Sequence, residues 1–153
     1  MLRDAVSVGG LTSGENRSMS EPVKSLVHFE IREDLHVGTI QSSKVVNPIN
    51  IGVFSTEVLT YIQKHPKLVL ILNFEHVDYL SSSVISELLR IRKAIEQMAG
   101  ELRLCGISDM IQEVFEITNL TSMFTIHKDG VDADVRRYKR MKEIQAQESA
   151  WKE

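Results

Sequence analysis

The chain has 153 residues, of which 42% are hydrophobic and 25% are charged, and its formal net charge is −3. This balance predicts one globular domain with an ordinary apolar core, and the weak negative charge argues against nucleic acid as a partner. No apolar run approaches the about 20 residues of a membrane span and the N-terminus lacks the apolar segment of a secretory signal, so we expect a cytoplasmic protein.

Residues 1–22 are rich in serine and glycine and have no sustained apolar period. We expect them to form a flexible N-terminal extension. Residues 25–33, SLVHFEIRE, alternate apolar and polar side chains, and DLHVGTI follows at 34–40, so a β-hairpin is predicted. Residues 41–50, QSSKVVNPIN, are expected to form a loop, because Pro48 and two asparagines interrupt any regular element.

The middle of the chain alternates helical and strand patterns. Apolar residues recur at helical spacing after residue 51, and Pro66 ends that helix. Five successive apolar residues, Leu68 to Leu72, are typical of a strand covered on both faces. A second helix is predicted from Ser82 to Met98, with one apolar stripe and Gly100 as its C-terminal cap.

The pattern continues with a strand at 101–107, a helix at 108–120 that Ser108 or Asp109 can cap, and a strand at 123–128. A terminal helix follows from Asp132. Alternating strands and helices predict an α/β fold: a mixed, largely parallel sheet of about five strands with four helices packed around it. We expect the domain to span 23–130, with 131–153 as a helix that extends beyond the core.

No catalytic or metal-binding pattern stands out. The histidines lack a metal-ligand spacing, and the single cysteine, Cys105, lies in an apolar strand, where we expect a buried residue and no disulfide. Phosphate-binding glycine loops and a nucleophile elbow are absent. We therefore expect no enzyme, no metal and no cofactor.

Three successive serines, Ser81 to Ser83, stand where the apolar strand gives way to the second helix. One interpretation is a helix cap, for which a single serine suffices. The other is a phosphorylation site, because a helix N-terminus favours an anion and a phosphate adds about −1.5 to −2 charges there. Such a phosphate would change the surface without unfolding the helix.

The span from about residue 23 to 129 resembles a STAS domain of the anti-sigma-factor antagonist family. The resemblance rests on LVLILNFEHVDYL leading into SSSVISELLRIRKAI, then on ELRLCGIS and DMIQEVFEITNLTSMFTIHKD. The family usually has Asp-Ser-Ser-Gly at the junction, so the resemblance implies Ser83 as the phosphorylated residue, with Ser82 as second choice. Ser81 replaces the family's Asp, and Val84 replaces its Gly, adding bulk at the docking edge.

The resemblance implies a regulatory module that binds an anti-sigma factor or a serine/threonine protein kinase, and that phosphorylation releases. The expected partner-binding residues are Asn47, Asn50, Tyr79, Ser81, Ser82, Ser83, Val84 and Glu87. The main alternative is an unmodified scaffold or sensory subunit that assembles with copies or paralogues. A pocket for a small molecule or a lipid is a third possibility, and catalysis is the least favoured.

The terminal helix carries a basic run, RRYKRMK, at 136–142, which we interpret as a solvated face; docking to an acidic partner is the alternative. Trp151 near its end could pack on the sheet or mediate self-association.

Overall fold

A computed structural model describes residues 25–45 and 47–152; the expected N-terminal extension, 1–22, lies outside these ranges. The strands and helices follow in the order β1 (Val27–Arg32), β2 (Leu35–Ile40), β3 (Lys44–Val45), α1 (Pro48–Lys64), β4 (Val69–Asn73), β5 (Tyr79–Leu80), α2 (Ser82–Gln97), β6 (Glu101–Cys105), α3 (Asp109–Ile117), a 3₁₀ turn (Thr121–Met123), β7 (Thr125–Ile126) and α4 (Val131–Lys152).

The main sheet has five strands in the order β1-β2-β4-β6-β7. β1 and β2 form the predicted antiparallel hairpin, and the other neighbours pair in parallel. This confirms the expected mixed, largely parallel sheet. The short strands β3 and β5 form a separate parallel pair that the sequence did not predict, because two-residue strands carry no readable period.

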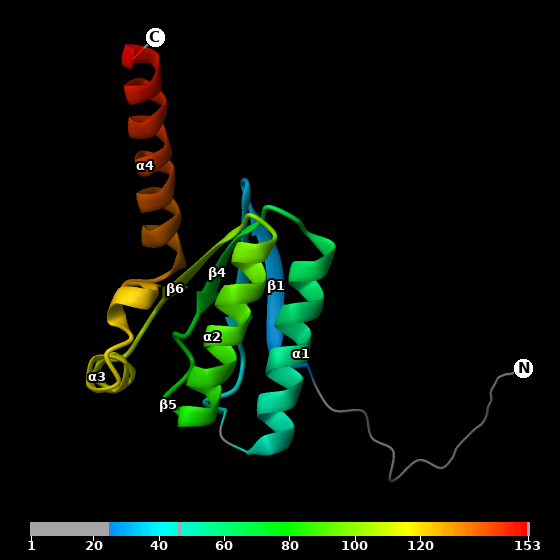
Figure 1. The fold of residues 1–153 in the computed structure, drawn as a ribbon. Helices are drawn as coiled ribbons and strands as arrows, with labels where there is room; N and C mark the ends of the chain where they lie inside the picture. Colours follow the sequence, from blue (N-terminus) through cyan, green and yellow to red (C-terminus); the bar gives the residue numbers. More distant parts are fainter. Residues whose placement is uncertain (1–24, 46, 153) are drawn as a thin grey trace, which may run out of the picture.

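One face of the sheet is covered by α1 and α2, which lie side by side (Figure 1). Their buried apolar stripes meet the strand side chains that point to the same face. This main core also includes residues of α3. Its fully buried members include Phe54, Val58, Ile62, Leu70, Leu72, Leu88, Ile91, Ile95 and Phe115. The apolar stripe predicted for α2 is therefore the buried face of this helix.

The predicted loop at 41–50 is wrong over its second half. Asn47 is the N-cap of α1, and its Oδ1 accepts a hydrogen bond of 2.8 Å from the backbone N–H of Asn50. Pro48 occupies the first turn, where its missing N–H costs nothing and its fixed φ suits a helix. The proline thus starts a helix rather than interrupting one.

The C-terminus of α2 also differs from expectation. The left-handed residue after the helix is Ala99, with φ 60°, and the N–H of Gly100 bonds to the carbonyl of Ile95 at 2.9 Å. Gly100 is required for another reason. A Cβ there would lie 2.4 Å from the carbonyl oxygen of Leu68, so only glycine allows this close approach.

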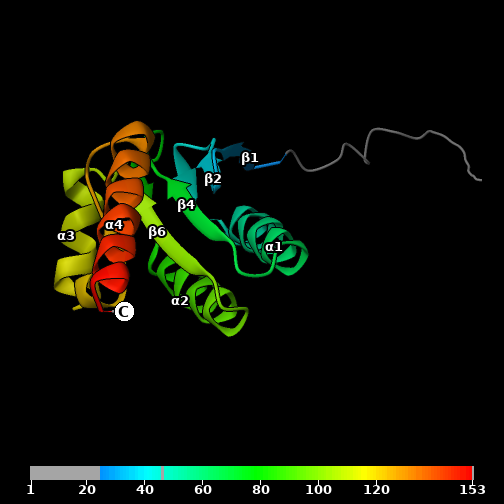
Figure 2. The ribbon, with the colours of Figure 1, turned by 90° about the horizontal axis from the view of Figure 1, so that it is seen from above.

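The opposite face of the sheet carries α4 (Figure 2). Val135 of α4 packs on a small apolar cluster that includes Val37, Ile71 and Cys105. Cys105 is buried as predicted, and burial raises the pKa of its thiol to about 12. This second core is much smaller than the first, so polar contacts contribute to holding α4 in place.

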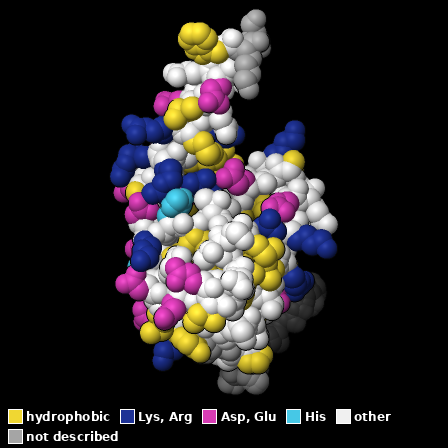
Figure 3. All heavy atoms as spheres, turned by 60° about the vertical axis from the view of Figure 1, so that its left-hand side comes forward, with side chains coloured by type: hydrophobic (Ala, Val, Ile, Leu, Met, Phe, Trp, Pro, Cys, Tyr) yellow, Lys and Arg dark blue, Asp and Glu magenta, His cyan; other side chains and the backbone are white. Residues whose placement is uncertain are grey.

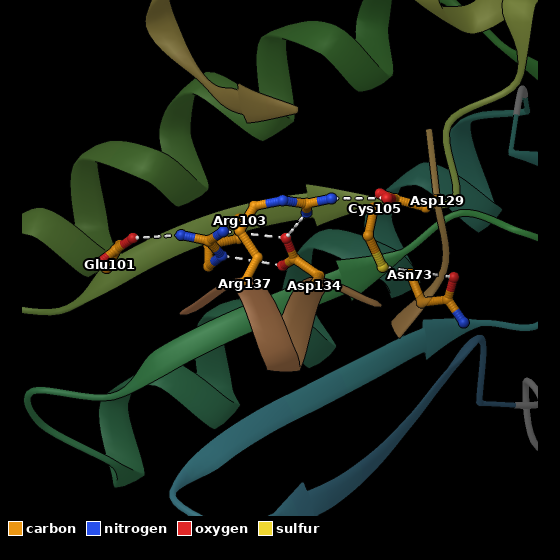
Figure 4. A network of polar contacts seen from close by, with 7 residues as sticks. All are labelled: Asn73, Glu101, Arg103, Cys105, Asp129, Asp134 and Arg137. Atoms are coloured by element: carbon orange, nitrogen blue, oxygen red, sulfur yellow. Dashed lines mark hydrogen bonds and ion pairs between the residues drawn. The ribbon is translucent and has the colours of Figure 1, made fainter. Parts of the chain in front are cut away.

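A buried ion pair joins α4 to β6. Arg103 donates to Asp134 through Nε at 2.9 Å and through Nη2 at 3.0 Å, and the two side chains are only 4% and 0% exposed. Arg137 also donates to Asp134, at 2.7 Å, and to Asp129, at 2.6 Å (Figure 4). The interpretation of the basic run as a solvated face is therefore wrong for Arg137. Lys and Arg side chains gather along α4 in Figure 3.

Trp151 does not pack on the sheet. Its side chain is 87% exposed, near the end of a helix of 22 residues that projects beyond the body (Figure 1). Of the alternatives for this residue, packing on the sheet is excluded.

Candidate functional site

The helices α1 and α2 begin at the same end of the molecule, beside the short β3–β5 pair (Figure 1). Parallel strands feeding helices leave the helix N-termini at the carboxyl edge of the sheet, where α/β proteins form their binding sites. The backbone N–H groups of the first turn of each helix give this edge a partial positive charge. The predicted serine junction lies at this edge.

The three serines have different roles. Ser81 is the N-cap of α2, and its Oγ accepts a hydrogen bond of 3.4 Å from the backbone N–H of Val84. Ser82 and Ser83 are the first helical residues, and both are exposed. Within the described ranges, neither of their hydroxyl groups makes a hydrogen bond. One serine therefore caps the helix, and two hydroxyls remain accessible.

Val84 is not at the docking edge. Its side chain is 1% exposed and belongs to the main core, so it cannot contact a partner. The expectation that Val84 adds bulk at the docking edge is wrong, because Val84 lies on the buried face of α2 and not on its exposed face. Val84 therefore adds volume to the core and none to the docking edge.

Glu87 links the two helices. Its Oε1 accepts from the hydroxyl of Ser55 on α1 at 2.6 Å and from Nη1 of Arg90 at 2.8 Å. Ser55 is buried, and the Glu87 side chain is mostly covered. The sequence singled out Glu87 but missed Ser55 and Arg90, because no local pattern shows which residues of two helices face each other.

A groove of about 460 Å³ lies between α1 and α2. Ser83 and Glu87 line it, together with Pro48, Ile51, Gly52, Ser55, Thr56, Leu59 and Arg90. The other expected partner-binding residues lie outside its lining. Asn47 is exposed at the cap of α1, Asn50 is half-buried in its first turn, and Tyr79 is 49% exposed on β5.

A second recess, of about 590 Å³, lies beside the start of α4 and has mixed charge, with Arg32, Glu75 and Arg136 among its lining residues. No group of three or more His, Cys, Asp or Glu side chains among the described residues could hold a metal ion. Within the same ranges, no helix has the length and apolar character needed to cross a membrane.

Two histidines that are far apart in sequence meet beside α1. The Nδ1 atom of His36 lies 2.6 Å from the hydroxyl of Tyr61, and the rings of His36 and His65 are 4.8 Å apart. Tyr61 stacks on Phe29 with ring centroids 3.9 Å apart. Burial, and secondarily the neighbouring His65, lowers the pKa of His36.

The model of the STAS domain family matches residues 28–133. The chain therefore belongs to the STAS domain family, as its sequence resemblance implied, and it is a domain of the anti-sigma-factor-antagonist type. It is 33% identical over 82 residues to BtrV, a proposed anti-sigma factor antagonist of Bordetella bronchiseptica, covering 54% of this chain and 70% of BtrV. It is 32% identical over 72 residues to the anti-sigma-B factor antagonist of Staphylococcus aureus, covering 47% and 67% of the two chains.

Solved structures show the same fold. A proposed anti-sigma factor antagonist from Thermotoga maritima has a TM-score of 0.62 and 20% identity, and the match covers 72% of this chain and 92% of that one. The anti-sigma factor antagonist SpoIIAA in its unphosphorylated form has a TM-score of 0.56 and 17% identity, with 74% and 97% covered.

Proposed function

We propose that this protein is a cytoplasmic anti-sigma factor antagonist, a regulatory binding module rather than an enzyme. It binds an anti-sigma factor that is also a serine/threonine kinase through the edge where α1 and α2 begin. The binding residues are Asn47, Asn50, Tyr79, Ser81, Ser82, Ser83 and Glu87. The names of the relatives support this function, and the cluster of exposed polar groups at the helix N-termini supports the location.

Phosphorylation of Ser83, or of Ser82 as second choice, releases the partner. This proposal depends on the cap of α2, which Ser81 alone provides. Ser82 and Ser83 are exposed, and their hydroxyl groups make no hydrogen bond to any residue that the structure describes. The helix N-terminus stabilises a phosphate on either residue, so the domain stays folded. Added charge then repels a docked surface. SpoIIAA is described in an unphosphorylated form, which fits a family that is switched in this way.

Mass spectrometry after incubation with the purified anti-sigma factor kinase and ATP tests the switch. We expect one phosphate on Ser83, its loss in Ser83→Ala, and at least tenfold weaker binding of the phosphorylated protein. Ser86→Ala is the matched control, because Ser86 is an exposed serine one turn further along α2. Absence of phosphate on both Ser82 and Ser83 would refute the switch but not the binding.

A scaffold role is the second candidate, and the end of α4 favours it. Trp151 is exposed, and Ile144 is half-exposed on the projecting part of the helix, where hydrophobic side chains are visible in Figure 3. Large apolar side chains left in water often mark an association surface. Light scattering of the full chain and of a variant lacking 142–153 tests this role. A monomer in both cases would contradict it.

A further inference from the structure

The groove between α1 and α2 has two unlike walls. The α1 side presents apolar groups from Pro48, Ile51 and Leu59 beside the polar Ser55 and Thr56, and the α2 side presents only polar residues, which are Ser83, Glu87 and Arg90. A cleft that combines apolar surface with a few polar groups is typical of a site that takes an anchoring side chain of a partner. The groove begins at Ser83, so it is continuous with the proposed binding edge.

Gly52 lines this groove, and the fold does not require a glycine at this position. It lies inside α1, where glycine is less stable than alanine. Its backbone has no positive φ, and a Cβ built on it would meet nothing within 4 Å. Neither a turn nor a close approach requires glycine there. Its lack of a side chain does have one consequence, which is that the groove stays open to solvent.

The charges of the groove indicate what it accepts. Glu87 and Arg90 pair with each other at 2.8 Å, and the remaining lining residues are uncharged. An uncharged apolar side chain can therefore enter without breaking an ion pair. A charged side chain would compete with Glu87 or with Arg90 for its partner in this pair. A phosphate on Ser83, one helical turn from Glu87, would make the same wall strongly negative.

We propose that this groove holds an aliphatic or aromatic side chain of the anti-sigma factor, and that Gly52 keeps the groove open for it. This inference rests on the proposed function, because the occupant is the partner named there. The side chain packs against Pro48, Ile51 and Leu59, while Ser83 lies on the rim. Phosphorylation would then act on the anchor directly.

Filling the groove tests the inference. Gly52→Leu puts a side chain into the open space, and we expect at least a tenfold loss of affinity for the purified anti-sigma factor in isothermal titration calorimetry. Gly52→Ala should weaken binding less. The melting temperature of both variants should equal or exceed that of the wild type, because a helical glycine is replaced. Gln63→Leu is the control, because Gln63 is exposed on the same helix outside the groove.

The outcomes separate the two proposals. Tight binding by Gly52→Leu, within twofold of the wild type, would overturn the groove inference alone. An equal loss in Gly52→Leu and Gln63→Leu would also overturn it, because the effect would not depend on the groove. A wild-type protein that does not bind the anti-sigma factor would refute the proposed function itself, and the groove inference with it.

Discussion

The buried ion pair between β6 and α4 makes a quantitative prediction. In Asp134→Asn, the carboxylate that accepts from Arg103 at 2.9 and 3.0 Å and from Arg137 at 2.7 Å loses its charge. Arg103 stays buried, since its side chain is 4% exposed, and it cannot reach water without moving α4. Removing one partner of a buried pair costs about 3–5 kcal/mol where the other charge is left without compensation. We expect the lower end of this range, because Glu101 still accepts from Nη1 of Arg103 at 3.1 Å.

Such a loss is large against a typical domain stability of about 5–15 kcal/mol. We expect the melting temperature to fall by about 10 °C, from about 3 °C for each kcal/mol in a chain of this size. If α4 detaches before the body unfolds, the loss is limited to the free energy that docks α4. Cys105 reports on this event, because it lies in the apolar cluster that Val135 covers.

The assay therefore combines thermal unfolding with the rate at which a thiol reagent modifies Cys105. We expect a slow reaction in the wild type, since burial raises the pKa of Cys105 to about 12, and a much faster one in Asp134→Asn. Asp132→Asn is the matched control, because Asp132 is an exposed acid on the same helix that pairs with Arg32. Equal melting temperatures and equal Cys105 reactivity in the two variants would refute the reasoning. Replacing both partners with Arg103→Met and Asp134→Leu should recover most of the stability.

Three further predictions concern capping, backbone packing and pH. Ser81→Ala should lower the free energy of unfolding by about 1 kcal/mol through loss of the α2 cap, whereas Ser83→Ala should leave it unchanged in the same denaturant titration; equal effects would contradict the assignment of the cap. Gly100→Ala should destabilise the fold in a thermal melt, because its Cβ would lie 2.4 Å from the carbonyl of Leu68, and an unchanged melting temperature would contradict that contact. Burial lowers the pKa of His36, so its neutral form contributes stability that is complete above about pH 6.5 and is lost as the pH falls below that value. Denaturant titrations between pH 7 and 5 should show that the free energy of unfolding of His36→Gln depends less on pH than that of the wild type. The same pH dependence in both proteins would refute this role of His36.

Local sequence patterns predicted most of the fold. The apolar stripe of α2, the hairpin of β1 and β2, and the alternation of strands and helices all depend on spacing within a few residues of the chain. Capping is equally local, so a helix start at the serine junction was predictable. The strand and helix on either side of Ser81–Ser83, together with the segments from residue 101 to 129, resembled the STAS domain family, which the comparisons confirm.

Tertiary structure alone decided the contacts between distant residues. Ser55 and Glu87 meet because α1 and α2 pack side by side, and Arg103 and Asp134 meet because α4 returns to the far face of the sheet. The groove that Gly52 lines also forms only because α1 and α2 lie side by side. Such pairings depend on the relative placement of whole elements, which no spacing along the chain encodes, whereas a serine before an apolar stripe is a property of the chain itself.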